Sequence, residues 1–128
     1  MATWDEVSRI ALSLPETSKG TSFGHRSWRV RDKLFVWERP LRRADLAALG
    51  PSAPQGPILG VRVEHEGMKH AMIDNDPEVF FTTPHFDGYP AVLLRLELIS
   101  AKALHEVIED AWLACAPKRL ASAYLAAR

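Results

Sequence analysis

Apolar residues recur along the chain with two different periods, and each period predicts a type of element. A spacing of three to four residues, typical of a helix with one buried face, runs through residues 4–14 and again through residues 104–115. Apolar and polar residues alternate in residues 28–30 and 34–38, as they do in half-buried strands. The pattern therefore predicts a helix near each end of the chain and, across an Asp32-Lys33 turn, a β-hairpin between them.

Residues that favour the ends of helices set the boundaries of these elements. Thr3 and Glu6 form a capping-box pattern at the start of the first helix, and Pro15 ends that helix. Ser100 is suited to cap the longest helix, because its hydroxyl can accept from the first turn. Pro117 is suited to the first turn of a last helix.

The middle of the chain contains shorter elements. Residues 42–50 end in a glycine and predict a short helix, and the proline-rich residues 51–57 predict a loop. A strand is expected over residues 58–64. A helix follows over residues 65–76, and we expect its buried side to carry Met68, Ala71 and Met72.

The apolar segment at residues 91–100 predicts the strongest strand, in which one row of side chains faces the core. That row consists of Val92, Leu94, Leu96 and Leu98. Since helices and strands do not alternate regularly, the fold class is α+β, a single domain over residues 1–128. We expect a largely antiparallel sheet with the N- and C-terminal helices packed on one face. A chain of 128 residues, 47% hydrophobic, is long enough for one core.

The single cysteine and the N-terminal residues indicate the cellular compartment. Cys115 has no partner for an intramolecular disulfide or a Cys-rich zinc site, which fits a reducing compartment. The first ten residues lack the basic start and apolar core of a signal peptide, and no apolar run approaches a membrane span. A cytoplasmic protein without a membrane partner is expected.

Basic side chains are concentrated in one segment of a chain whose formal net charge is zero. Residues 26–43 contain seven basic residues and only two acidic ones. The seven are Arg26, Arg29, Arg31, Lys33, Arg39, Arg42 and Arg43. They are candidate phosphate-binding residues of a hairpin that enters a nucleic-acid groove as a wing. The alternative is an ordinary solvated face of a half-buried hairpin.

Three stretches occur together in an order typical of a known family. They are "GTSFGHRSWRVRDKLFVW", "DPEVFFTTPHFDGYPAVLLRL" and "EDAWLACAPKRL". The chain resembles the MmcQ/YjbR family of small bacterial proteins over nearly its whole length. The resemblance implies a CyaY-like α+β fold and the family's usual label of DNA-binding protein. Residues 39–57 depart from shorter members, so no function of that segment follows from the resemblance.

The segment "FFTTPHFDGYP" at residues 80–90 gathers groups with several possible roles. A catalytic hypothesis would pair His85 with Asp87 and use Thr82 or Thr83 as nucleophile, but no catalytic motif surrounds them. A metal hypothesis would add His25, His65 or His70 to His85 and Asp87, without a recognised ligand spacing. The favoured role is to brace the following strand through its prolines and turn. We predict no catalytic residue, metal or cofactor.

Aromatic residues suggest a groove between the hairpin and this segment. Its candidate residues are His85, Phe86, Asp87 and Tyr89, joined by some of Phe23, Trp28, Phe35 and Trp37. We expect Phe86 and Tyr89 to be exposed, and Trp28, Trp112, Tyr124 and Cys115 to be in the core. The leading hypothesis is a non-enzymatic protein that binds DNA weakly and without sequence specificity through the hairpin. The alternative is a module that binds a small molecule or a protein in the groove.

Overall fold

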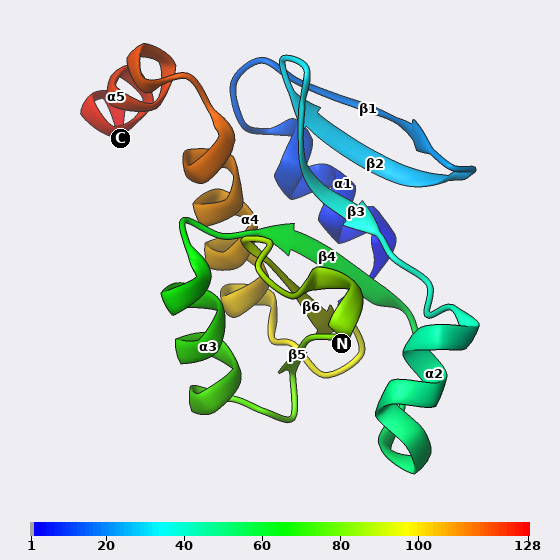
Figure 1. Cartoon of the computed structure of the whole chain (residues 1–128). Coiled ribbons are helices and arrows are strands. Elements are labelled where there is room, and N and C mark those ends of the chain that lie inside the picture. The colour runs from blue at the N-terminus through cyan, green and yellow to red at the C-terminus, as the bar shows by residue number, and fades with distance from the viewer. Residues whose placement is uncertain (1) are drawn as a thin grey trace.

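Six antiparallel strands form the centre of the molecule (Figure 1). The computed structural model describes residues 2–128. The strands are β1 (Thr17–Ser22), β2 (His25–Val30), β3 (Lys33–Glu38), β4 (Ile58–Arg62), β5 (Phe80–Phe81) and β6 (Ala91–Arg95). They lie in the order β1-β2-β3-β4-β6-β5, so β1 and β5 are the edges. The predicted hairpin is β2 and β3, whose register shifts between Trp28 and Arg29.

Five α-helices accompany the sheet. They are α1 (Trp4–Leu12), α2 (Arg43–Leu49), α3 (Glu66–Asn75), α4 (Ala101–Cys115) and α5 (Lys118–Ala127), with single 3₁₀ turns at Gly50–Ser52 and Pro84–Phe86. The predicted caps are present, since the Thr3 hydroxyl accepts from the Glu6 amide and the Ser100 hydroxyl from the Ala103 amide. Within residues 2–128 no helix has the length and apolar character needed to cross a membrane.

The main hydrophobic core lies between one face of the sheet and helices α1 and α4. Alternate residues of β6 point toward it, beginning with Val92 and Leu94, and Trp28 and Trp112 are fully buried in it. Trp112 also donates from Nε1 to the Pro15 carbonyl at 3.0 Å, which ties α4 to the end of α1. The predicted α+β class, the antiparallel sheet and the packing of terminal helices on one face are thus confirmed.

The opposite face of the sheet is buried by an irregular segment instead of a helix. A second apolar cluster there contains Trp37, Ile58, Phe86, Ala91 and Leu93. Figure 1 shows the chain between β5 and β6 passing in front of β4 and β6, on the side away from α1 and α4. Residues 83–90 therefore cover a second core, which agrees with the bracing role predicted for the "FFTTPHFDGYP" segment.

Strand β1 was not predicted from the sequence. Its residues, "TSKGTS", contain no large apolar side chain, and four of the six are exposed. The strand forms because its backbone pairs with β2 over its full length, from Thr17 opposite Val30 to Ser22 opposite His25. An edge strand needs no apolar pattern when backbone pairing alone places it.

Two predicted apolar faces were partly wrong. In α3 the buried residue is Lys69, with Met72 and Ile73 half-buried, whereas Met68 and Ala71 are exposed. A lysine takes the core position because its ammonium finds a buried carbonyl and a carboxylate partner. Strand β6 ends at Arg95, so Leu98 lies in a turn and is exposed.

Gly60 in β4 allows the Trp37 ring of β3 to lie against the sheet. The two residues pair across the strands, and a β-carbon on Gly60 would lie 2.5 Å from the Trp37 ring. We predict that Gly60→Ala destabilises the protein by about 2 kcal/mol, because the indole must move or the strands must separate. Urea unfolding followed by circular dichroism measures this change.

Gly20→Ala in β1 provides the matched control. A β-carbon there would approach nothing closer than the Ser27 Oγ at 4.0 Å. The control should change the free energy of unfolding by less than about 1 kcal/mol. Equal losses in the two variants would show that the Trp37 contact does not determine the effect.

Candidate functional site

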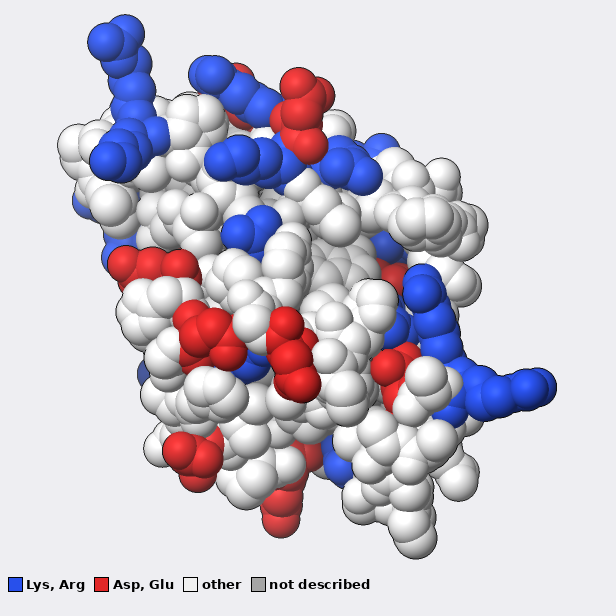
Figure 2. Space-filling view, viewed as in Figure 1, with Lys and Arg blue, Asp and Glu red and all other residues white. Residues whose placement is uncertain are grey.

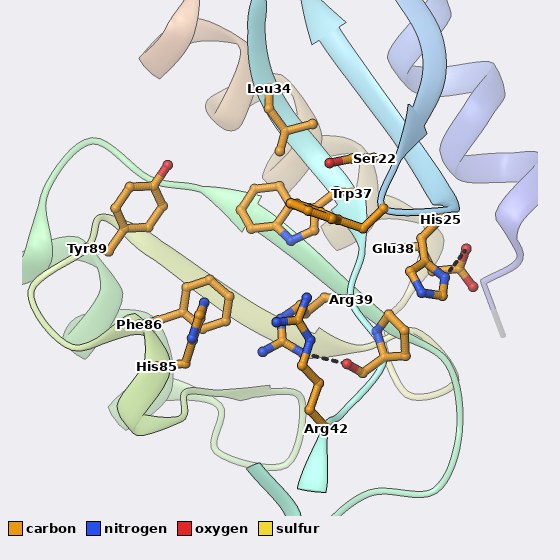
Figure 3. Close-up of a pocket in the computed structure, with 12 residues that line it drawn as sticks. Ser22, His25, Leu34, Trp37, Glu38, Arg39, Arg42, His85, Phe86 and Tyr89 are labelled. Atoms are coloured by element: carbon orange, nitrogen blue, oxygen red, sulfur yellow. Dashed lines mark hydrogen bonds and ion pairs between the residues drawn. The ribbon is translucent and has the colours of Figure 1, made fainter. Parts of the chain in front are cut away.

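A groove of about 360 Å³ opens beside the second apolar cluster (Figure 3). Three parts of the chain line it: the β1–β2 turn, strand β3 with its continuation toward α2, and the 3₁₀ turn before β6. The lining residues are Ser22, Phe23, His25, Leu34, Trp37, Glu38, Arg39, Pro40, Arg42, His85, Phe86 and Tyr89. The predicted basic segment and the "FFTTPHFDGYP" segment therefore border the same hollow.

Trp37 and Phe86 form the apolar wall of the groove. Their ring centroids are 6.4 Å apart and both side chains are largely buried. Figure 3 shows the nitrogen edge of the Trp37 indole turned toward Arg39. The wall thus combines two aromatic rings with an N–H donor.

Arg39 is a buried residue of the groove lining that contacts Phe86 and Asp45. Its guanidinium carbon lies 5.2 Å from the centroid of the Phe86 ring, and Nη2 lies 3.0 Å from the Asp45 carboxylate. Another guanidinium N–H donates to the Pro40 carbonyl. A charge this deeply buried requires such partners, because leaving it unpaired costs several kcal/mol.

Asp45 of α2 stabilises the position of Arg39 and the start of α2. Besides pairing with Arg39, it accepts a hydrogen bond from the Arg42 amide at 2.8 Å, which fixes the start of α2 and the backbone of Arg42. Burial raises the pKa of Asp45, but the Arg42 amide and the Arg39 charge lower it more, so the pKa lies below its ordinary 3.8. Asp45 is therefore ionised at neutral pH.

Lys69 of α3 stabilises the wall of the groove at Phe86. Only 1% of its surface is exposed, and its Nζ donates to the Phe86 carbonyl at 2.7 Å while lying 3.0 Å from Glu66. The irregular segment thus obtains from Lys69 a hydrogen bond that no neighbouring strand supplies. This contact fixes Phe86 in the groove wall.

Three exposed ring-containing side chains form the rim of the groove: Tyr89, His85 and Phe23. Tyr89 is 45% exposed, and its ring lies 5.1 Å from the Arg62 guanidinium carbon. His85 is exposed and lies edge-on to Phe86 at 4.8 Å. Phe23 is 91% exposed at the tip of the β1–β2 turn, with a φ of 53°. Positive φ at both Phe23 and Gly24 is typical of a two-residue hairpin turn, and this turn brings the Phe23 ring to the groove lining.

The seven basic candidates do not form one free patch. Arg39 is buried, so its assignment to a nucleic-acid surface was wrong. Arg26 donates to Glu38 at 3.2 Å and Arg31 to Glu16 at 2.7 Å. Glu16 has a lowered pKa because of the hydrogen bond from Arg31. Four remain in the described part of the chain without a carboxylate within ion-pair distance: Arg29, Lys33, Arg42 and Arg43.

The free basic residues are also divided in space. Figure 2 shows Lys and Arg in separate groups, along the edge that carries the β2–β3 turn and near the start of α2. Uncharged and acidic surface lies between them. Of the four, only Arg42 lines the groove.

The structure also places the residues of the "FFTTPHFDGYP" segment. His85, Phe86 and Tyr89 line the groove, whereas Asp87 is exposed and does not. The expected exposure of Phe86 was wrong, because its ring is 7% exposed and completes the second core. Tyr89 is exposed as expected.

The pairing of His85 with Asp87 and the metal cluster considered from the sequence are not formed among residues 2–128. His85 makes no hydrogen bond or ion pair to a described group, and Thr83 is buried. Burial raises the pKa of the Cys115 thiol, which keeps it protonated. No three His, Cys, Asp or Glu side chains in the described part of the chain converge in a way that could hold a metal ion.

Sequence reasoning missed Asp45 and Lys69, which support the groove without lining it. A signal for Asp45 was present, since it stands three residues after Arg42, the spacing at which a side chain caps a helix. For Lys69 the signal was its three-to-four spacing from Met72 and Ile73. A lysine at that position is ordinarily counted as solvent-exposed.

We predict that Asp45→Asn destabilises the protein by about 3 kcal/mol, because Arg39 loses its buried counter-charge. The contribution of Asp45 is present above its ordinary pKa of 3.8 and is lost as the pH falls through the lower folded-state pKa. The stability difference between wild type and variant should therefore begin to shrink as the pH falls below 3.8 and be smallest below the folded-state pKa. Urea unfolding at neutral pH and near pH 3 measures both.

The control is Asp74→Asn, which removes an exposed acid of α3. Its effect should stay within about 0.5 kcal/mol. An Asp45→Asn loss no larger than this, or one unchanged at acid pH, would contradict a stabilising ionised Asp45.

Comparison with known proteins agrees with this fold. A family model described as YjbR matches residues 12–114. The "Uncharacterized protein Mb2600" of Mycobacterium bovis and the "Uncharacterized protein Rv2570" of Mycobacterium tuberculosis are each 54% identical over 129 residues, 98% of both chains. Among solved structures, the Deinococcus radiodurans protein DR2400, with a domain described as DUF419, is similar at a TM-score of 0.66. That alignment covers 88% of this chain and 78% of the other at 16% identity, and therefore shows the fold alone. From the family match and the motifs that resemble it, this chain belongs to the YjbR family.

Proposed function

We propose that this protein is a non-catalytic binding module whose ligand is a small molecule held in the groove. The observation that carries the proposal is the convergence of aromatic rings and polar side chains from three separate parts of the chain on one hollow. A mostly apolar concavity with a few directed polar groups is the usual form of a small-ligand site.

The size of the groove favours a small ligand. Its volume of about 360 Å³ is near the lower end of the range for such sites, about 300 to 1,000 Å³. A molecule of one or two rings matches this volume. An extended protein segment would need a longer contact surface than the twelve lining residues provide.

The proposal assigns no chemical step to the groove. General acid–base or nucleophilic catalysis requires a base within hydrogen-bond reach of the group it activates. In the described residues, His85 has no such partner, and Asp45 is engaged by Arg39 and the Arg42 amide. The polar groups of the groove can position a ligand.

A ligand screen by NMR tests the proposal. The chain has four tryptophans, and their indole N–H signals are separate reporters. We expect ring-containing fragments to shift the Trp37 signal, because Trp37 lines the groove. The Trp112 signal should stay in place, because that N–H is bonded to the Pro15 carbonyl beneath α4. Tyr89→Ala, which removes an exposed rim ring, should weaken the hits.

A matched control is Leu125→Ala, which truncates a similarly exposed side chain on α5. This variant should keep wild-type affinities. A broad fragment set that leaves the Trp37 signal unmoved, or hits that bind Tyr89→Ala and wild type alike, would count against a ligand in the groove.

Weak DNA binding is a second candidate function. The observation that favours it is the set of four basic side chains without carboxylate partners, of which Arg29 and Lys33 belong to the hairpin. Neutralising two phosphates makes affinity depend on salt with a slope of about −1.8. We expect Arg29→Ala combined with Lys33→Ala to lower the magnitude of that slope by about this amount.

Titration of a generic DNA duplex at several salt concentrations measures the effect. The control is Lys102→Ala combined with Lys118→Ala, which removes the same charge from exposed positions on α4 and α5. If wild type does not bind duplex at low salt, or if both double variants lose the same slope, the hairpin is not a DNA-binding wing.

A further inference from the structure

We infer that the ligand of the groove is a planar aromatic compound that carries an anionic oxygen group, either a carboxylate or a phosphate. The inference rests on the proposed function and adds the chemical class of the ligand. Two features of the groove support it: the balance of charge along its walls and the arrangement of its rings.

The acids near the groove are already neutralised. The carboxylate of Glu38 accepts from the backbone and side chain of Arg26, both at 3.2 Å, and His25 Nδ1 lies 3.9 Å away. Asp45 is paired with the buried Arg39. Neither carboxylate is therefore free to repel an anion or to bind a cationic ligand.

Arg42 is the charge that remains. In the part of the chain that the structure describes, no carboxylate lies within ion-pair distance of its guanidinium. Figure 3 shows its side chain directed into the groove, toward Arg39. The backbone of Arg42 is fixed by its amide hydrogen bond to Asp45. A fixed stem and a free planar guanidinium suit bidentate binding of a carboxylate or a phosphate.

The Arg39 guanidinium lies beside this site but is already paired. Its Nη2 lies 3.0 Å from the Asp45 carboxylate, so this buried pair adds no net charge to the groove. Arg42 therefore carries the unpaired positive charge. Because the site is partly enclosed by apolar side chains, its positive potential is screened less than on an open surface.

The aromatic side chains of the groove favour a ligand with a planar aromatic ring. Phe86 and Tyr89 lie at 6.4 Å from each other, and Phe86 already stacks with the Arg39 guanidinium on its face. Phe23 adds an exposed ring from the β1–β2 turn. A flat aromatic compound can stack on the exposed Tyr89 and Phe23 rings and contact the edge of the apolar wall, whereas a saturated ring gains only from apolar contact.

NMR titration of the full chain tests the inference with matched probes. 2-Naphthoate and 2-naphthyl phosphate carry ring and anion, 2-naphthamide carries the ring without charge, and cyclohexanecarboxylate carries the anion on a saturated ring. We expect at least one naphthyl anion to shift the Trp37 indole signal with a dissociation constant about tenfold lower than that of 2-naphthamide. Cyclohexanecarboxylate should also bind more weakly than 2-naphthoate.

Neighbouring arginines provide the matched variants. Arg42→Gln should weaken the naphthyl anion about tenfold and leave 2-naphthamide unchanged. Arg43→Gln removes an equally exposed charge that does not line the groove, and its effect should be less than about twofold. The tighter of 2-naphthoate and 2-naphthyl phosphate then identifies the anionic group, and either result supports the inference.

Two kinds of failure can be told apart. If 2-naphthamide or cyclohexanecarboxylate binds as tightly as 2-naphthoate, or if the two arginine variants behave alike, the ligand class is wrong while a small-molecule groove stands. If no probe and no member of the fragment screen shifts the Trp37 signal, both the ligand class and the proposed function are overturned.

Discussion

The buried ion pair between Arg39 and Asp45 is the interaction on which the groove depends. It joins the end of β3 to α2 and places a guanidinium against the Phe86 ring. Burying two charges costs several kcal/mol, and good geometry with additional hydrogen bonds is needed to offset that cost. Here the Arg42 amide and the Pro40 carbonyl supply those bonds. The same contacts fix the backbone from which Arg42 reaches the groove.

The groove also depends on the irregular segment at residues 83–90, which covers the second face of the sheet. A helix satisfies its own backbone, whereas residues 83–90 form three backbone hydrogen bonds among themselves and leave other groups to be paired with partners elsewhere. Lys69 provides one from α3, at the Phe86 carbonyl, and Arg62 provides another at the Pro90 carbonyl. A hollow remains between this cover and the β1–β2 turn, since residues of both line the groove. The groove is therefore a consequence of how the second face of the sheet is covered.

Sequence patterns predicted the helices and strands that have a regular apolar periodicity. They failed for a strand placed by backbone pairing and for a side chain buried by a polar contact. The terminal helices, the β2–β3 hairpin and the caps at Thr3 and Ser100 were predicted, since each has a local signal. Strand β1 has no such signal, because its position comes from pairing with β2. Arg39 was misplaced for a related reason. Two other arginines of the same basic segment, Arg42 and Arg43, are exposed, and only the approach of α2 supplies the carboxylate that allows Arg39 to be buried.

The sequence by itself determined the fold class and the family resemblance, because spacing and residue type express these properties locally. The tertiary structure decided which side chains share the groove. Phe23, Trp37 and His85 are distant in the chain, and their meeting depends on the register of β1 and β3 and on the folded position of the loop. It also decided which charges stay free, since pairs such as Arg31 with Glu16 and Arg26 with Glu38 form between segments 12 or 15 residues apart. A count of charges along the chain cannot show this.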